Sequence, residues 1–338
     1  MFNFDVPRYE KVVGDAIALR SEIEAAVDKI CKEGYSNIFF IGCGGTYAHS
    51  LPMKYWLDSS SNKIESHSVI ASEFMLMGHK RFSKDSVCVF SSRSGNTKEI
   101  VEAAKFCKET GARTIVYVSN DNTPVCAYAD YTLFSFAEDD CLCEAIYTYM
   151  ITMVARFMKN AGELSKYDQF MNEYAKIVPC LIKAKEFYES RCAKMAADYK
   201  DKDYHMVIGS GMLWGEAYDY AMCILEEMQW IKTKSIHAAE FFHGTLELVE
   251  EDTSLILFYG EDETRPLMER VMNFAKKVTK VIHVFDTKDI ELPFSDPEFR
   301  KVVSPMIMYV ITERLSCYLE KERNHSLKIR RYYRQIEY

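Results

Sequence analysis

The sequence predicts an α/β protein of two domains, each a doubly wound, mostly parallel sheet flanked by helices. Short apolar runs alternate with longer segments of helical periodicity, which is the order that builds a parallel sheet covered on both faces. An apolar run that leads into a glycine loop occurs twice, at 42–46 and at 209–211. This repetition indicates a weak internal duplication. A chain of 338 residues is long enough to form a hydrophobic core in each half.

The first half of the chain is expected to contribute five strands. A helical stretch at 8–33 ends at Gly34, because glycine readily adopts the left-handed conformation that closes a helix. Periodicity predicts another helix at 98–110, and then a long helical region at 143–200 with a break at Pro179. Apolar runs bounded by turn residues predict the strands at 37–41, 64–70, 86–90, 114–118 and 131–136.

The second half repeats this pattern with fewer strands. Apolar runs predict strands at 205–208, 254–259 and 281–285. Periodicity predicts helices at 214–232, 267–278 and 302–322, and a basic, aromatic tail follows them. We place the domain boundary near residues 195–203. The expected organisation is an N-terminal helix at 1–34, a first domain at 35–195 and a second domain with the tail at 200–338.

Composition and charge restrict the classes of function. Hydrophobic residues make up 48% of the chain and charged residues 27%, which is typical of a soluble globular protein. The net charge of −8 argues against a nucleic-acid partner, since nucleic-acid-binding proteins carry a basic face. The eleven cysteines are scattered without the spacing of a metal site, and no targeting segment or membrane-spanning run is evident. We therefore expect a cytoplasmic protein with no membrane partner and no bound metal.

The loop at 91–97 is the strongest local signal of a ligand site. Five of its seven residues are Ser, Thr or Gly, and a predicted helix begins directly after it. Hydroxyls and backbone N–H groups at a helix N-terminus suit a phosphate dianion. A simple helix cap is the alternative, but one hydroxyl suffices for a cap. The glycine loop at 42–46 follows the first strand and would flank the same crevice, because ligands of open parallel sheets lie at the carboxyl ends of the strands.

Neither glycine loop matches the fingerprint of a dinucleotide-binding protein. Tyr47 stands where the third glycine of that fingerprint belongs in the first loop, and Trp214 stands there in the second. We therefore expect no nucleotide cofactor.

Three motifs, at 42–46, 92–97 and 240–244, together resemble the double-SIS (sugar isomerase) family. That family includes the isomerase half of glucosamine-6-phosphate synthase and the fructosamine-6-phosphate deglycases. The resemblance runs from about residue 35 to the end of the chain, and the 240–244 motif and the tail look more like the deglycases. It implies two SIS domains, a phosphorylated sugar–amino acid substrate and no cofactor. It also implies a homodimer or higher homo-oligomer with the site at the subunit interface.

The resemblance also implies roles for individual residues. Glu227 corresponds to a general base, and His243, sixteen residues later, corresponds to an acid. Because the family's sites lie between subunits, the two need not come from one chain. Glu240, Arg331 and Tyr333 are supporting candidates, although Glu240 also suits a helix cap and the two tail residues also suit a solvated terminus. The expected phosphate and sugar contacts are Gly44, Gly45, Thr46, Ser92, Ser94, Thr97 and Ser119.

The chemistry fits these residue types. Cleavage of a fructosamine phosphate removes a proton beside the ketone, returns one to the neighbouring carbon and hydrolyses the resulting imine, so a carboxylate and an imidazole suit it. The favoured hypothesis is therefore a deglycase that yields hexose 6-phosphate and a free amino acid. An amino-sugar-phosphate isomerase or deaminase is the first alternative. The segment 332–335 argues against it, because the amino-sugar synthases carry a catalytic lysine in their own ending. A non-catalytic phosphosugar sensor is the second alternative.

Overall fold

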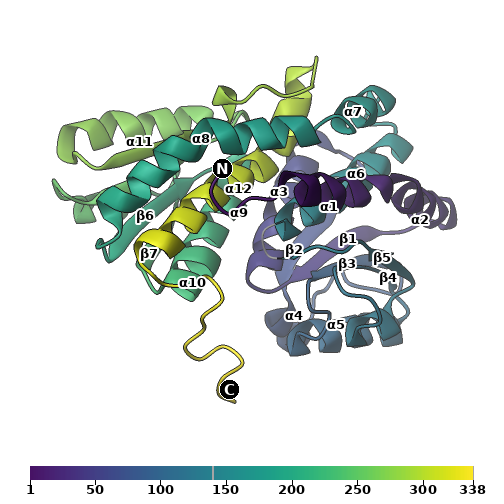
Figure 1. Cartoon of the computed structure of the whole chain (residues 1–338). Coiled ribbons are helices and arrows are strands. Elements are labelled where there is room, and N and C mark those ends of the chain that lie inside the picture. Colours follow the sequence, from purple (N-terminus) through teal and green to yellow (C-terminus); the bar gives the residue numbers. More distant parts are fainter. Residues whose placement is uncertain (139–140, 338) are drawn as a thin grey trace. The chain divides into compact units, whose positions relative to one another are not determined.

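The computed structural model describes residues 1–138 and 141–337 and divides into two compact units (Figure 1). The N-terminal unit comprises Asp5–Val178 with Pro293–Ser295, and the C-terminal unit comprises Met1–Phe4, Pro179–Leu292 and the chain from Asp296 onward. Among the described residues, no helix combines the length and the apolar character needed to cross a membrane.

The N-terminal unit is built on a five-stranded, wholly parallel sheet with the strand order β2-β1-β3-β4-β5. All five strands lie where the apolar runs predict them. The sequence also predicts α5 with its bounds, Lys98–Thr110. The strands are β1 (Asn37–Gly42), β2 (Ser66–Ile70), β3 (Ser86–Ser92), β4 (Arg113–Val118) and β5 (Tyr131–Phe134). The remaining helices are α1 (Val6–Ala18), α2 (Arg20–Glu33), α3 (Gly45–Ser60), α4 (Ala71–Met77), α6 (Leu142–Asn160) and α7 (Tyr167–Tyr174).

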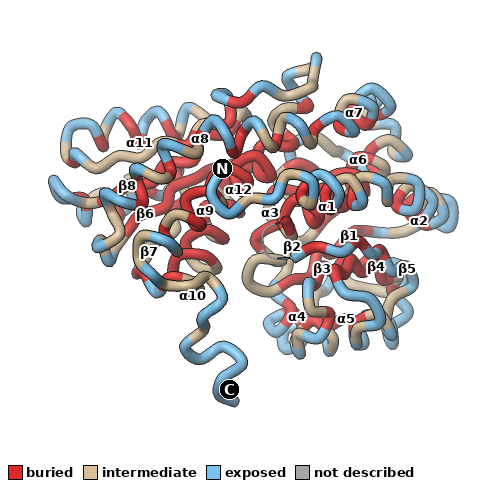
Figure 2. Tube along the Cα trace, in the orientation of Figure 1, coloured by how far each residue is buried: buried red, intermediate tan, exposed pale blue. Residues whose placement is uncertain are grey.

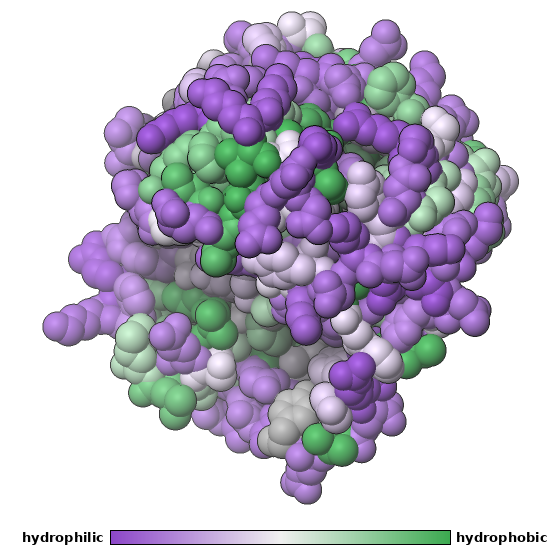
Figure 3. All heavy atoms as spheres, turned by 90° about the vertical axis from the view of Figure 1, so that its left-hand side faces the viewer, coloured by the Kyte–Doolittle hydropathy of each residue, from purple (hydrophilic) through white to green (hydrophobic). Residues whose placement is uncertain are grey.

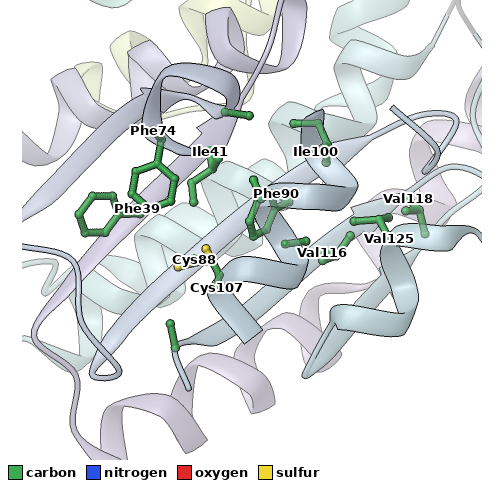
Figure 4. Packing of buried hydrophobic residues seen from close by; sticks show 14 residues of the cluster. Phe39, Ile41, Phe74, Cys88, Phe90, Ile100, Cys107, Val116, Val118 and Val125 are labelled. Atoms are coloured by element: carbon green, nitrogen blue, oxygen red, sulfur yellow. The ribbon is translucent and has the colours of Figure 1, made fainter. Parts of the chain in front are cut away.

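The sheet of this unit is buried on both faces, which is why its central strands are continuous apolar runs. Every residue of β1 and β3 is buried (Figure 2). Figure 4 shows side chains of β1, β3 and β4 packed against α4 and α5, with Phe39 and Phe90 facing Phe74 and Ile100. This packing holds the carboxyl ends of β1 and β3 in place, and the predicted phosphate loops at 42–46 and 91–97 lie at these ends.

Two predicted helical stretches are divided in the structure. The stretch at 8–33 forms two helices, α1 and α2, separated at Leu19. The region at 143–200 forms α6, α7 and α8 (Val178–Tyr199). Pro179 lies in the first turn of α8, where its missing N–H has no intrahelical partner to lose, so the break falls just before it.

The boundary between the units lies between Val178 and Pro179, earlier in the chain than the expected 195–203. The reason is the packing of α8. Its Tyr188 ring stacks on Phe285 with 5.6 Å between centroids, and its Glu189 forms a 2.8 Å ion pair with Arg314. The helix therefore belongs to the core of the C-terminal unit.

The C-terminal unit is built on a four-stranded parallel sheet with the order β7-β6-β8-β9. Seen from the side of α11 in Figure 3, its outer surface is mostly hydrophilic with hydrophobic patches. The strands are β6 (Tyr204–Gly209), β7 (Lys232–His237), β8 (Ser254–Tyr259) and β9 (Ile282–Asp286). The principal helices are α8, α11 (Arg265–Val278) and α12 (Pro297–Glu322).

The predicted helix at 214–232 differs most from the structure. It consists of α9 (Trp214–Asp219), a π-helical segment η3 (Tyr220–Glu226) and the short α10 (Glu227–Gln229). Trp230 then closes α10 in the left-handed conformation, with φ of 55°. The strand β7 begins where the helix was expected to end, because a polar edge strand lacks the apolar run that marks the other strands.

Candidate functional site

The strand order of the N-terminal unit brings the two predicted phosphate loops together. The chain leaves β1 for β2 on one side and reaches β3 on the other, and the carboxyl ends of two such strands are where open parallel sheets bind their ligands. Ile41 pairs with Phe90 in the parallel register, which places the segments 42–46 and 91–97 next to each other. We call these segments the loop pair.

The first loop presents the N-terminus of a long helix. Gly44, with φ of 54°, turns the chain into α3, and Gly45 is the first helical residue. The Thr46 hydroxyl donates to the carbonyl oxygen of Cys43 at 3.0 Å and accepts from its N–H at 3.1 Å. The hydroxyl is therefore committed to holding the loop. The first-turn N–H groups of α3, which have no intrahelical partner, are what this loop offers to an anion.

The second loop presents hydroxyls as well as a helix N-terminus. Ser92 Oγ accepts from the N–H of Gly95 at 3.0 Å, which tightens the turn and leaves the Ser92 O–H hydrogen able to donate. Ser94 Oγ lies 3.5 Å from the backbone nitrogen of Asn96 and is half-buried. Thr97 is the N-cap residue of α5, and its side chain makes no capping hydrogen bond. The loop pair thus gathers two helix N-termini and three hydroxyls at neighbouring strand ends.

Ser119 lies one strand further along the same edge. It directly follows β4, whose Val118 pairs with Ser92 of β3. Its hydroxyl is fully buried, deeper than those of the loop pair, and has no hydrogen-bond partner within the described part of the chain. A neighbouring side chain, Asn120, donates to the carbonyl oxygen of Arg93 at 2.9 Å and ties the β4 loop to the loop pair.

The corresponding glycine loop of the C-terminal unit is already filled by a carboxylate of the protein. Asp262 accepts from the N–H of Met212 at 2.9 Å and from the N–H of Thr264 at 2.8 Å. A Cβ at Gly211 would lie 2.4 Å from Asp262 Oδ1, so the glycine is needed for this close approach. Ser210 Oγ is also engaged, 2.8 Å from Thr264 Oγ1. We therefore expect an external anion to bind at the loop pair and not at the glycine loop 209–211.

Glu227 stands at the start of α10, directly after the π-helical segment. π-helical turns are rare and occur frequently at functional sites. Its Oε1 accepts from Nε of Arg330 in the tail at 2.7 Å. The adjacent Glu226 instead accepts from the Thr233 hydroxyl at 2.6 Å. The structure therefore distinguishes two neighbouring carboxylates that the sequence alone does not.

Glu227 lines a pocket of about 610 Å³ between the end of the η3–α10 helix and the tail. The guanidinium of Arg331 lies 4.1 Å from the ring centroid of Trp230, in cation–π geometry. Arg331 and Tyr333, both predicted as supporting residues, thus lie with Glu227. Sequence reasoning missed Arg330, whose contact with Glu227 spans 103 residues of chain. The residues that line this pocket include Glu227, Trp230, Lys232, Arg330, Arg331 and Tyr333.

His243 and Glu240 follow β7, at the opposite end of this strand from Glu227. Both side chains are exposed in the turn after the strand, where the N–H of His243 donates to the carbonyl oxygen of Glu240 at 3.0 Å. Glu227 precedes β7, whose six residues span roughly 20 Å. Within one chain, the predicted base and acid therefore stand at opposite ends of a strand and do not meet.

Comparison with known proteins gives one consistent result. The SIS domain profile matches residues 33–159. The chain is 30% identical to the fructosamine deglycase FrlB of Bacillus subtilis, over 94% of this chain and 97% of that protein. It is 25% identical to the fructoselysine 6-phosphate deglycase of Escherichia coli, over 97% and 93%. A Bacillus subtilis structure described as a phosphosugar isomerase superposes with a TM-score of 0.88 at 29% identity, covering 96% and 99% of the two chains.

Proposed function

This chain belongs to the SIS domain family, and from that premise we propose that it is a deglycase acting on a 6-phosphorylated fructosamine, such as fructoselysine 6-phosphate. The products are hexose 6-phosphate and a free amino acid. The observation that carries the proposal is similarity over nearly the whole length of two proteins named for this activity. The loop pair and the pocket at Glu227 supply the two chemical functions that the reaction needs.

The loop pair binds the phosphate end of the substrate in this proposal. A phosphate dianion accepts hydrogen bonds from the N-termini of α3 and α5, where the helix dipoles also favour negative charge. The hydroxyls of Ser94 and Thr97 add donors beside those N–H groups. Binding through the phosphate leaves the first carbons of the sugar free for proton transfer.

Glu227 and His243 carry the proton transfers. The Glu227 carboxylate takes a proton from the amine-bearing carbon while His243 protonates the ketone oxygen, which gives an enaminol. A proton is then returned to the former ketone carbon as the nitrogen lone pair forms the imine. Water adds to the imine carbon, and the protonated amine leaves. General acid–base catalysis of this kind is worth about 10²- to 10⁴-fold per group.

In this proposal, two chains contribute to one site, because Glu227 and His243 lie at opposite ends of β7 in a single chain. Glu227 of one subunit meets His243 of the partner subunit across a homo-oligomeric interface. The strand that separates the two residues in a single chain supports this arrangement. A twofold interface then carries two equivalent sites.

The activity is tested by incubating the pure protein with fructoselysine 6-phosphate and measuring free lysine and glucose 6-phosphate. Glu227→Gln is expected to lose activity by about 10² or more while retaining substrate binding. Glu247→Gln is the matched control, since Glu247 is an exposed residue of the short helix η4 (Thr245–Leu248). Release of ammonia from glucosamine 6-phosphate with no release of lysine would contradict the proposal.

The shared site is tested by mixing two inactive variants, Glu227→Gln and His243→Asn, under conditions that exchange subunits. A mixed dimer contains one site with both residues intact, so about a quarter of wild-type activity is expected to return. If the two residues act within one chain, the mixture stays inactive.

A further inference from the structure

Cations outnumber carboxylates in the lining of the pocket beside Glu227, with Lys232, Arg330 and Arg331 against Glu226 and Glu227. Glu227 is paired with Arg330, and Glu226 is hydrogen-bonded to Thr233. Lys232 and Arg331 also line the pocket, and neither forms an ion pair with a carboxylate within the described chain. Two cations thus face a space that already contains the proposed base.

Arg331 is held in one orientation by an aromatic ring. Its guanidinium stacks over Trp230, and the Trp230 backbone has a positive φ that bulky residues rarely adopt. Stacking uses the face of the guanidinium and leaves its edge free for the parallel N–H···O bonds that a carboxylate accepts. The stack on Trp230 therefore leaves N–H donors of Arg331 available to an acceptor in the pocket.

The tail is attached to the end of α10 just before Arg331. The Gln229 side-chain amide donates to the carbonyl oxygen of His325 at 2.8 Å. Arg330 donates through Nη1 to the carbonyl oxygen of Leu327 at 2.6 Å. The ring of His325 contacts Trp230 edge-on at 4.4 Å. The tail therefore forms one wall of the pocket, and these contacts hold it there.

We propose that Arg331 and Lys232 form a subsite for the carboxylate of the amino acid that leaves the sugar. The inference rests on the proposed function, because it takes Glu227 to act on the carbon that carries the amine. The leaving group then extends from Glu227 into the pocket, whose volume of about 610 Å³ accommodates an amino acid. Trp230 and Tyr333 supply apolar surface for its methylene groups. The substrate class is thereby narrowed to sugar adducts of amino acids over adducts of simple amines.

The experiment compares two substrates that differ only in this carboxylate. One is fructoselysine 6-phosphate, and the other is the same adduct of 1,5-diaminopentane, which is lysine without its carboxylate. Wild-type protein is expected to favour the lysine adduct in kcat/KM by about tenfold or more. Arg331→Gln and Lys232→Gln lower kcat/KM for the lysine adduct and do not lower that for the diaminopentane adduct, whose ammonium group gains nothing from the two cations. The double variant brings the ratio close to one.

Lys328→Gln is the matched control, because Lys328 is an exposed cation of the same tail that does not line the pocket. It is expected to keep the wild-type ratio. Equal kcat/KM for the two adducts in wild-type protein, or an unchanged ratio in the Arg331 and Lys232 variants, would overturn the subsite and leave the deglycase proposal standing.

A protein that turns over neither adduct would overturn the proposed function instead. Titration calorimetry of both adducts against wild-type protein and Arg331→Gln then decides the subsite separately. Tighter binding of the lysine adduct that Arg331→Gln removes supports the carboxylate subsite. Equal dissociation constants for the two adducts rule it out.

Discussion

The Nε of Arg330 lies 2.7 Å from Oε1 of Glu227, and this ion pair joins the tail to the start of α10. Arg330 is itself held by its bond to the carbonyl oxygen of Leu327. The charged hydrogen bond holds one oxygen of the Glu227 carboxylate in place, so the tail positions the proposed base. Arg330 is accordingly a positioning residue, distinct from the carboxylate subsite formed by its neighbour Arg331.

Replacing Arg330 should therefore impair turnover more than binding. Arg330→Gln is expected to lower kcat on fructoselysine 6-phosphate by about tenfold or more, since small misplacements of a catalytic group are costly. Arg330→Lys keeps the charge without the planar fork and should restore part of the loss. Steady-state kinetics measure both, with Lys328→Gln as the control. An Arg330→Gln variant with wild-type kcat would show that the ion pair is incidental.

The loop pair gives a second prediction, at Gly95. This residue has φ of 61°, and a Cβ there would lie 1.9 Å from Thr123 Oγ1. Gly95→Ala should displace the loop that carries Ser94, raise KM for the phosphosugar about tenfold and lower the free energy of unfolding by about 1–3 kcal/mol. Kinetics and urea denaturation measure the two effects.

Gly14→Ala is the matched control for Gly95→Ala. Gly14 lies inside α1, and a Cβ there meets no heavy atom within 4 Å. Alanine in a helix is favoured over glycine by about 0.5–1 kcal/mol, so this variant should be as stable as wild type or slightly more stable. If Gly95→Ala bound the phosphosugar normally, the loop pair would not be the phosphate site.

Sequence reasoning succeeded where local pattern decides structure. The strand β8 has the predicted bounds, 254–259, because it is a continuous apolar run, and α5 has them because its apolar positions recur with helical periodicity. Sequence reasoning missed β7, whose exposed lysines alternate with smaller residues at the sheet edge. It also missed η3, since no local pattern distinguishes a π-helical turn from an α-helical one.

The candidate site was predictable in parts for the same reason. Ser94 and Thr97 lie in a loop whose composition and position predict an anion site. The pairing of Arg330 with Glu227 and the filling of the second glycine loop by Asp262 both join segments far apart in the chain. Such contacts depend on the tertiary fold, and a single sequence contains no local signal for them.

Asp262 gives a third prediction. Asp262→Ala removes the acceptor for the N–H groups of Met212 and Thr264 in a buried loop, so the free energy of unfolding should fall by about 2–4 kcal/mol. Urea denaturation measures this effect. Asp252→Ala is the control, because Asp252 is a largely exposed partner of Lys202 and its loss should cost about 1 kcal/mol or less.

The same variant also distinguishes the two glycine loops. If the phosphate binds at the loop pair, folded Asp262→Ala should keep kcat/KM within about threefold of wild type, since Asp262 then takes no part in binding the phosphate. A folded variant with a large rise in KM would instead place the phosphate at the second loop.

The last prediction concerns acid stability and two histidines of the C-terminal sheet. Burial, together with the nearby charges of Arg323 and Lys202, lowers the pKa of His205 to about 4. Burial likewise lowers the pKa of His283 to about 4, with His205 contributing. His205 Nδ1 lies 2.7 Å from Ser254 Oγ, whereas Nε2 of His283 is buried without a partner within the described residues. Both rings therefore stay neutral in the folded protein.

An unfolded chain takes up a proton on each histidine below about pH 6.5, whereas the folded chain does so only near pH 4. The stability tied to these groups is therefore fully present above pH 6.5 and is lost as the pH falls towards 4. For His205 the slope reaches up to about 1.4 kcal/mol per pH unit. The urea midpoint should be flat from pH 8 to 7 and fall between 6.5 and 4.5.

Substitution isolates the two rings as the source of this slope. His205→Gln keeps a side chain that can hydrogen-bond Ser254, and His283→Phe keeps a ring against Tyr199, which His283 contacts at 4.5 Å. The double variant should lose most of the dependence between pH 6.5 and 4.5, because neither replacement takes up a proton. His243→Gln, at an exposed histidine, should keep the wild-type slope. A slope that survives in the double variant would come from other groups, above all His79, His237 and His325, whose pKa values burial also lowers.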